Sequence, residues 1–107
     1  MDEEVRLALE NLIQTIKGDE VYREYRKQLD LLRQSPELKR QVDDFRKRNY
    51  DMQMNEDLDF AKLTAFQEEF KTFRENPLVD SFLAAELEFC RMMQNVNFRL
   101  VESMDFE

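Results

Sequence analysis

Few side chains in this sequence can do acid–base, nucleophilic or metal chemistry. The 107 residues include no histidine, the commonest general base and metal ligand. The one cysteine, Cys90, has no histidine to activate it, and its place on an apolar helical face predicts a packed, inert thiol. A single glycine cannot build a glycine-rich phosphate loop. We therefore expect no catalytic, metal-ligating or cofactor-binding residues, and interpret the chain as a non-enzyme.

One carboxylate, Glu86, stands where an apolar side chain is expected. At about 100° per residue it falls on the apolar stripe of its helix, between Phe82 and Phe89. A buried carboxylate without a counter-charge is costly or takes up a proton. We expect an arginine partner, Arg46 first and Arg74 second, because a guanidinium can make two charge-assisted bonds. The alternative is an exposed glutamate at the outer edge of the stripe.

The elements that position these residues are predicted to be helices. The chain has one glycine and two prolines, so the turns of a β-sheet are missing. Caps and apolar periodicity place five helices within a single domain, 1–107, at residues 2–17, 20–34, 36–54, 59–75 and 77–103. The sequence therefore indicates an all-α fold.

The ends of these helices have recognisable capping residues. Gly18 is interpreted as the C′ residue of the first helix, and Asp19 as the cap of the second. Asp57 or Asp59 is expected to cap the fourth. Ser35-Pro36 and Asn76-Pro77 each place a capping side chain before a proline at the first helical position. This repeat suggests two antiparallel αα-hairpins, with the first helix packed alongside.

Two helices carry patterns that favour an oligomeric helical bundle. The segment 36–54 has a heptad seam, in which Asn49 either fixes register and oligomeric state or faces solvent. The segment 77–103 is about 40 Å long at 1.5 Å per residue and has a broad apolar face. We expect its own chain to leave that face partly uncovered. Homo- or hetero-oligomerisation, as a dimer or a larger assembly, is therefore predicted.

The charge of the chain limits its partners. The net charge is −8, and such a surface repels phosphate, so we expect no direct binding to nucleic acid or to an anionic membrane. The first residues are acidic, unlike a signal peptide, and no apolar run approaches membrane-spanning length. A cytoplasmic location is the expectation.

The sequence resembles the YlbF/YmcA family of small helical bacterial proteins. The matching residues form two blocks, Pro36-Glu37-Leu38 with Phe45-Arg46, Asn49 and Gln53, and Asn76-Pro77-Leu78-Val79 with Phe82, Ala85-Glu86 and Phe89. The early Tyr22 and Tyr25 also fit. The resemblance implies that Phe45, Arg46, Asn49, Asn76, Pro77, Phe82, Glu86 and Phe89 determine the fold and its interfaces.

The resemblance also implies a regulatory function. Members of this family act in competence, sporulation and biofilm development of Gram-positive bacteria, in complexes with related small proteins, and influence RNA processing through the endoribonuclease RNase Y. Some of these complexes carry iron–sulfur clusters. A cluster here would need cysteines from partner chains, because this chain has only Cys90.

Two functions fit these observations. The first is a non-enzymatic adaptor that binds partner proteins through helical faces. The alternative is a small holdase-like chaperone, which stripes rich in phenylalanine and methionine on an acidic body would also serve.

Overall fold

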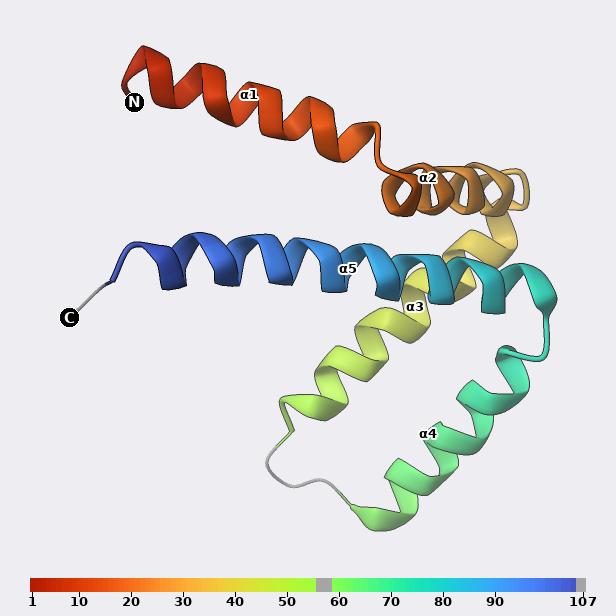
Figure 1. Ribbon diagram of the computed structural model, residues 1–107. Helices are drawn as coiled ribbons and strands as arrows, with labels where there is room; N and C mark the ends of the chain where they lie inside the picture. Colours follow the sequence, from red (N-terminus) through yellow and green to blue (C-terminus); the bar gives the residue numbers. More distant parts are fainter. Residues whose placement is uncertain (56–58, 106–107) are drawn as a thin grey trace. The chain divides into compact units, whose positions relative to one another are not determined.

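The computed structural model describes residues 1–55 and 59–105, and this part of the chain is helical without any strand (Figure 1). The helices are α1 (Glu3–Lys17), α2 (Glu20–Arg33), α3 (Pro36–Gln53), α4 (Phe60–Phe73) and α5 (Pro77–Ser103). The prediction of an all-α fold is confirmed. Each helix begins and ends within two residues of its expected bounds.

Capping side chains define where most of these helices start. Asp2, Asp19, Asp59 and Asn76 each accept a hydrogen bond from the backbone N–H two residues further on, at 2.8, 2.8, 2.9 and 3.0 Å. Each such cap stabilises a helix by about 1 kcal/mol. Pro77 is the first residue of α5, where its missing N–H leaves no hydrogen bond unmade.

Two of the predicted helix ends differ in the structure. Ser35 precedes Pro36 as expected, but its side chain makes no capping hydrogen bond. Its ψ is 83°, whereas Asp2 and Asp59, which do cap, have extended ψ values of 146° and 128°. Gly18 is the C-cap of α1 in a right-handed conformation, with φ −87°, so its position does not require a glycine. The alternative cap Asp57 lies outside the described residues.

The chain forms two compact units. Unit 1 comprises Met1–Lys27 with Ala84–Glu107, and unit 2 comprises Gln28–Leu83. The helices α2 and α5 each contribute residues to both. The expectations of a single domain and of paired αα-hairpins stay predictions.

Unit 2 contains a hydrophobic core built from all of its helical segments. Its buried side chains are Leu29, Leu32, Val42, Phe45, Phe66, Val79 and Phe82. Fully burying one such side chain contributes roughly 1.5–3 kcal/mol. This core fixes α3 and α4 and the first turns of α5.

Unit 1 buries far fewer apolar side chains than unit 2. Ala85 is its one buried apolar residue among those described, and α1 has none. On α5, Phe89 packs against two tyrosines of α2, with ring centroids 5.3 Å from Tyr22 and 5.0 Å from Tyr25. Within the described chain, no helix combines the length and apolar character needed to cross a membrane.

Candidate functional site

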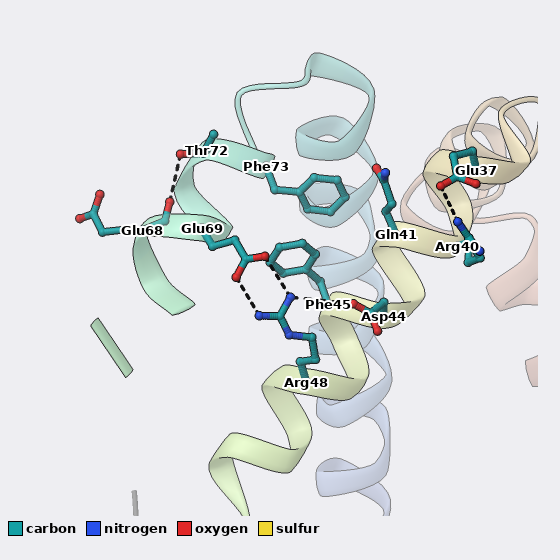
Figure 2. A pocket seen from close by; sticks show the side chains of 10 residues that line it. All are labelled: Glu37, Arg40, Gln41, Asp44, Phe45, Arg48, Glu68, Glu69, Thr72 and Phe73. Carbon is teal, nitrogen blue, oxygen red and sulfur yellow. Dashed lines mark hydrogen bonds and ion pairs between the residues drawn. The ribbon is translucent and has the colours of Figure 1, made fainter. Parts of the chain in front are cut away.

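An open groove lies between α3 and α4 in unit 2. Its volume is about 850 Å³. Figure 2 shows the side chains that line it, among them Phe45 and Arg48 from α3 and Glu69 and Phe73 from α4. The groove therefore combines stacked aromatic rings with charged groups.

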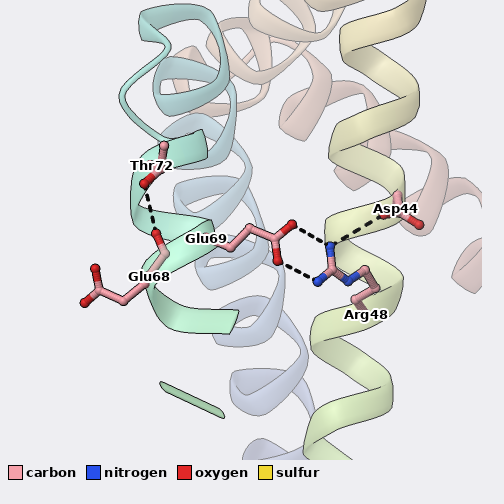
Figure 3. A network of polar contacts seen from close by, with 5 residues as sticks. All are labelled: Asp44, Arg48, Glu68, Glu69 and Thr72. Atoms are coloured by element: carbon pink, nitrogen blue, oxygen red, sulfur yellow. Dashed lines mark hydrogen bonds and ion pairs between the residues drawn. The ribbon is translucent and has the colours of Figure 1, made fainter. Parts of the chain in front are cut away.

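An arginine–glutamate pair joins the two helices across this groove. The guanidinium of Arg48 donates two hydrogen bonds to the carboxylate of Glu69, at 3.1 Å from Nη1 and 2.7 Å from Nη2 (Figure 3). A second carboxylate, that of Asp44, lies 3.9 Å from Nη1 one turn earlier on α3. The two parallel bonds fix the orientation of α4 against α3, because a guanidinium and a carboxylate match in geometry.

This pair shifts the pKa values of both partners. The hydrogen bond from Arg48 is the main reason that the pKa of Glu69 lies below its ordinary value of 4.5, with the positive charge of Arg48 adding to it and desolvation opposing it. The same hydrogen bond raises the pKa of Arg48, and the charges of Glu69 and Asp44 reinforce that shift. Both groups therefore stay ionised at neutral pH.

A cluster of aromatic rings forms the floor beneath the pair. Phe45 stacks on Phe73 with centroids 4.5 Å apart and planes inclined by 13°. Phe66 and Phe70 extend the cluster, with ring centroids 5.8 and 6.1 Å from that of Phe45. The guanidinium carbon of Arg48 lies 5.0 Å from the centroid of Phe45 and 5.2 Å from that of Phe66, within the range of a cation–π contact.

The chemistry of this groove is that of a helix–helix contact. Several of its charged groups bond to each other, since Arg48 pairs with Glu69 and Arg40 donates to Glu37 at 2.6 Å. Among the described residues, no group of three or more carboxylate or cysteine side chains is arranged to hold a metal ion. The groove explains how α3 and α4 are held, and it does not display a nucleophile with an adjacent base.

The predicted site residues are distributed over both units. In unit 2, Phe45 and Phe82 are buried, and Asn76 caps α5 at Pro77. Asn49 is exposed within this chain, as the solvent-facing alternative requires. Its role at an interface between copies stays a prediction.

The predicted arginine partners of Glu86 have contacts of their own in unit 2. Arg46, half exposed, lies 3.7 Å from Asp43, and Arg74 donates to Asp80 at 2.9 Å from Nε. Glu86 itself is intermediate in exposure, and its Oε2 atom is shut off from solvent. The choice between Arg46 and Arg74 as its partner stays a prediction.

The expectation for Cys90 is wrong. This thiol was expected to be packed, but the side chain is exposed. The reason is the breadth of the apolar face of α5. Phe89, the residue before it, faces the tyrosines of α2, and a helix turns about 100° between consecutive residues. Cys90 therefore lies on a part of the face that the described chain leaves open.

The sequence interpretation missed the Arg48–Glu69 pair. Arg48 follows Phe45 by three residues, and Glu69 stands between Phe66 and Phe70. Opposite charges that flank two phenylalanine stripes are a signal for such a pair. That signal is weak because each helix carries many charges.

Comparison with known proteins identifies a family. A family model described as "Control of competence regulator ComK, YlbF/YmcA" matches residues 5–105. No curated protein matches the chain, and no solved structure does so either. The match includes α2 to α5 in full and all of α1 except its first two residues.

Proposed function

This chain belongs to the YlbF/YmcA family, and we propose that it acts as a non-enzymatic regulatory adaptor that binds other proteins through its helical faces. The family description, control of a competence regulator, fits a protein that works by binding. The partners that we propose are further copies of the chain, related small helical subunits and a complex containing RNase Y, in the cytoplasm. Competence, sporulation and biofilm development are the processes proposed to depend on it.

The observation that carries this proposal is the exposed apolar surface of unit 1. Ten large apolar side chains there are at least 40% exposed, namely Met1, Val5, Leu7, Leu9, Leu87, Met93, Phe98, Leu100, Val101 and Met104. Scattered apolar residues are normal on a protein surface, but so many within one small unit favour protein–protein contact. Unit 2 has three such residues among those described, Tyr50, Met54 and Phe60, although it is slightly larger.

The adaptor function is tested by affinity purification from the native cell followed by mass spectrometry. The wild-type chain is compared with a variant that carries Val5→Ser and Leu9→Ser on α1. Both residues are exposed, so the variant is expected to fold. Recovery of a few defined partners that the variant loses supports the adaptor.

A matched control uses unit 2. Tyr50 on α3 is 59% exposed, similar to Val5 at 56%, and Tyr50→Ser should leave partner recovery unchanged. Equal losses in the control and in the α1 variant would contradict an adaptor surface on unit 1.

The holdase-like chaperone is the second candidate, because exposed methionine and phenylalanine side chains also suit unfolded clients. Met93, Phe98 and Met104 are the residues that favour it. A holdase suppresses the aggregation of unrelated client proteins and co-purifies with a broad set of them. Suppression of aggregation, measured by light scattering with two unrelated clients, would favour the chaperone over the adaptor.

A further inference from the structure

The apolar stripe of α1 matches a stripe on the second half of α5 when the two helices are read in opposite directions. On α1 the spacing is 4, 3, 1 and 3 residues, and the stripe consists of Val5, Leu9, Leu12, Ile13 and Ile16. Read backwards along α5, the same spacing gives Leu100, Val96, Met93, Met92 and Phe89. Residues at these spacings share one side of a helix. Two antiparallel helices with these stripes can pack along a seam that is apolar at every position on both sides.

The two stripes lie on helices of the same unit that run in opposite directions. Figure 1 shows that α1 begins at the end of unit 1 where α5 finishes. Each stripe extends over about 17 Å at 1.5 Å per residue, so their lengths agree. An antiparallel pair in this register places Val5 beside Leu100 and Ile16 beside Phe89.

The structure covers the inner part of these stripes and leaves the outer part open. The half-buried members are Leu12, Ile13, Ile16, Phe89, Met92 and Val96. The exposed members are Val5 at 56%, Leu9 at 40%, Met93 at 40% and Leu100 at 49%. Val5 and Leu100, which are the outermost residues of the two stripes, are the most exposed. The seam is therefore open at the end of the unit where α1 begins and α5 finishes.

The helix α1 is free to move as a whole, because little holds it in place. None of its residues is buried. Among the described residues, its side-chain hydrogen bonds stay within the helix, from Arg6 to Glu3 and from Thr15 to the carbonyl of Asn11. Gly18 and Asp19 alone join it to α2, and a glycine accommodates changes in φ and ψ at low cost. A short connection of this kind can act as a hinge for a rigid helix.

The charges at the open end of the seam oppose its closure. Residues 2–4 are all acidic, and Glu102 and Asp105 lie at the other side of the same end. Closing the seam brings these carboxylates nearer to each other, so their repulsion offsets part of the apolar attraction. Salt weakens such repulsion between exposed charges, because the screening length is only about 10 Å at 0.1 M ionic strength.

We propose that α1 is a strap that closes onto the second half of α5, with Val5 against Leu100 and Leu9 against Val96, and that the closed form covers the partner-binding surface of unit 1. A partner binds the open form, in which both stripes are accessible, and thereby shifts the chain toward that form. This inference rests on the proposed function, since it names the regulation of the same surface.

Cross-linking of two engineered cysteines tests the closure. In a Cys90→Ser background at low protein concentration, Val5→Cys with Leu100→Cys should form an intramolecular link with a short bis-maleimide. The yield should be at least fivefold higher than for Leu7→Cys with Leu100→Cys. Leu7 is the matched control, since it is 55% exposed but lies about 200° around the helix from Val5. Equal yields would overturn the proposal, and so would a covalent dimer in place of the intramolecular link.

Distances between two spin labels test whether the open and closed forms coexist. Leu7→Cys and Phe98→Cys carry the labels on the exposed sides of the two helices, away from the seam. Double electron–electron resonance should show two distance populations. The population with the shorter distance should at least double from about 0.05 M to about 0.5 M salt, because salt screens the acidic end. One population that does not respond to salt would contradict the strap.

Purification with the strap locked tests the regulation. The variant with Val5→Cys and Leu100→Cys should recover at least fivefold less of its partners after cross-linking than before. Equal recovery before and after cross-linking would overturn the proposal. If the variant recovers no defined partner even before cross-linking, the adaptor function fails instead, while the cross-linking yields still decide whether α1 closes.

Discussion

The two units of this chain differ in how much of their apolar surface is buried. Unit 2 contains seven of the eight buried apolar residues found in the described chain, and unit 1 contains ten of the fourteen large apolar residues that are exposed. The units are similar in length, so size does not explain the contrast. Unit 2 has a buried core and the Arg48–Glu69 pair, which we call the clasp, between α3 and α4.

The contrast indicates that the two units have different roles. Burial against the same chain stabilises unit 2, whereas unit 1 leaves apolar area that binding to another protein can remove from water. Residues of unit 2 should therefore affect the free energy of unfolding most, and those of unit 1 should affect association.

The largest expected effect is the loss of a core phenylalanine. Phe82 is 0% exposed, and Phe82→Ala should lower the free energy of unfolding by about 3–5 kcal/mol, because it leaves a cavity. Phe98→Ala in unit 1 is the matched control, since Phe98 is 66% exposed. This variant should change the free energy of unfolding by less than about 0.5 kcal/mol. Urea denaturation at low protein concentration measures both. Equal losses would remove the contrast between the units.

The next effect concerns the clasp between α3 and α4. Arg48→Ala removes the two hydrogen bonds to Glu69 and the cation–π contacts with Phe45 and Phe66. Since the Arg48 side chain is 39% exposed, we expect the free energy of unfolding to fall by about 1 kcal/mol, as measured by thermal or urea denaturation. Lys47→Ala, at the exposed neighbouring position, is the control. A loss no larger than that of the control would mean that the clasp is energetically neutral.

A smaller, stabilising effect is expected in unit 1. Gly18 has a right-handed backbone, and an added Cβ would meet carbonyl oxygens at 3.6 Å, an ordinary contact distance. Gly18→Ala should therefore raise the free energy of unfolding by about 0.4–1 kcal/mol, because alanine restricts the unfolded chain. A lower melting temperature for this variant would show that the glycine is required at the end of α1.

The smallest effect is the pH dependence of the clasp. The pKa of Glu69 is lowered in the folded chain, so its contribution to stability is present above pH 4.5 and is lost as the pH falls through the lowered value. The difference in melting temperature between wild type and Glu69→Gln should thus be largest at pH 7 and should shrink as the pH falls through the lowered pKa of Glu69. Glu68→Gln serves as the control. A difference that does not shrink at acidic pH would contradict an ionic contribution.

The helices themselves were predictable from local chemistry. Asp19 and Asn76 cap where their types and positions suggest, because a cap depends on residues that are close in sequence. Ser35 fails as a cap although its sequence context is similar, since its backbone ψ differs and ψ is set by the chain on both sides.

The long-range contacts were less predictable. The Arg48–Glu69 pair joins residues that are 21 positions apart, and periodicity alone does not say which of many charges meet. Cys90 shows the same limit of periodicity. Its place on an apolar stripe was clear, but periodicity does not tell which part of a broad stripe its own chain covers.

The central claim is that unit 1 carries the partner-binding surface. Hydrogen–deuterium exchange of the chain, alone and bound to its co-purified partner, tests this claim most directly. We predict that binding slows exchange in peptides from α1 and from residues 84–103, while α3 and α4 are unchanged. Slower exchange confined to α3 and α4 would place the partner on the groove of unit 2 and contradict the account.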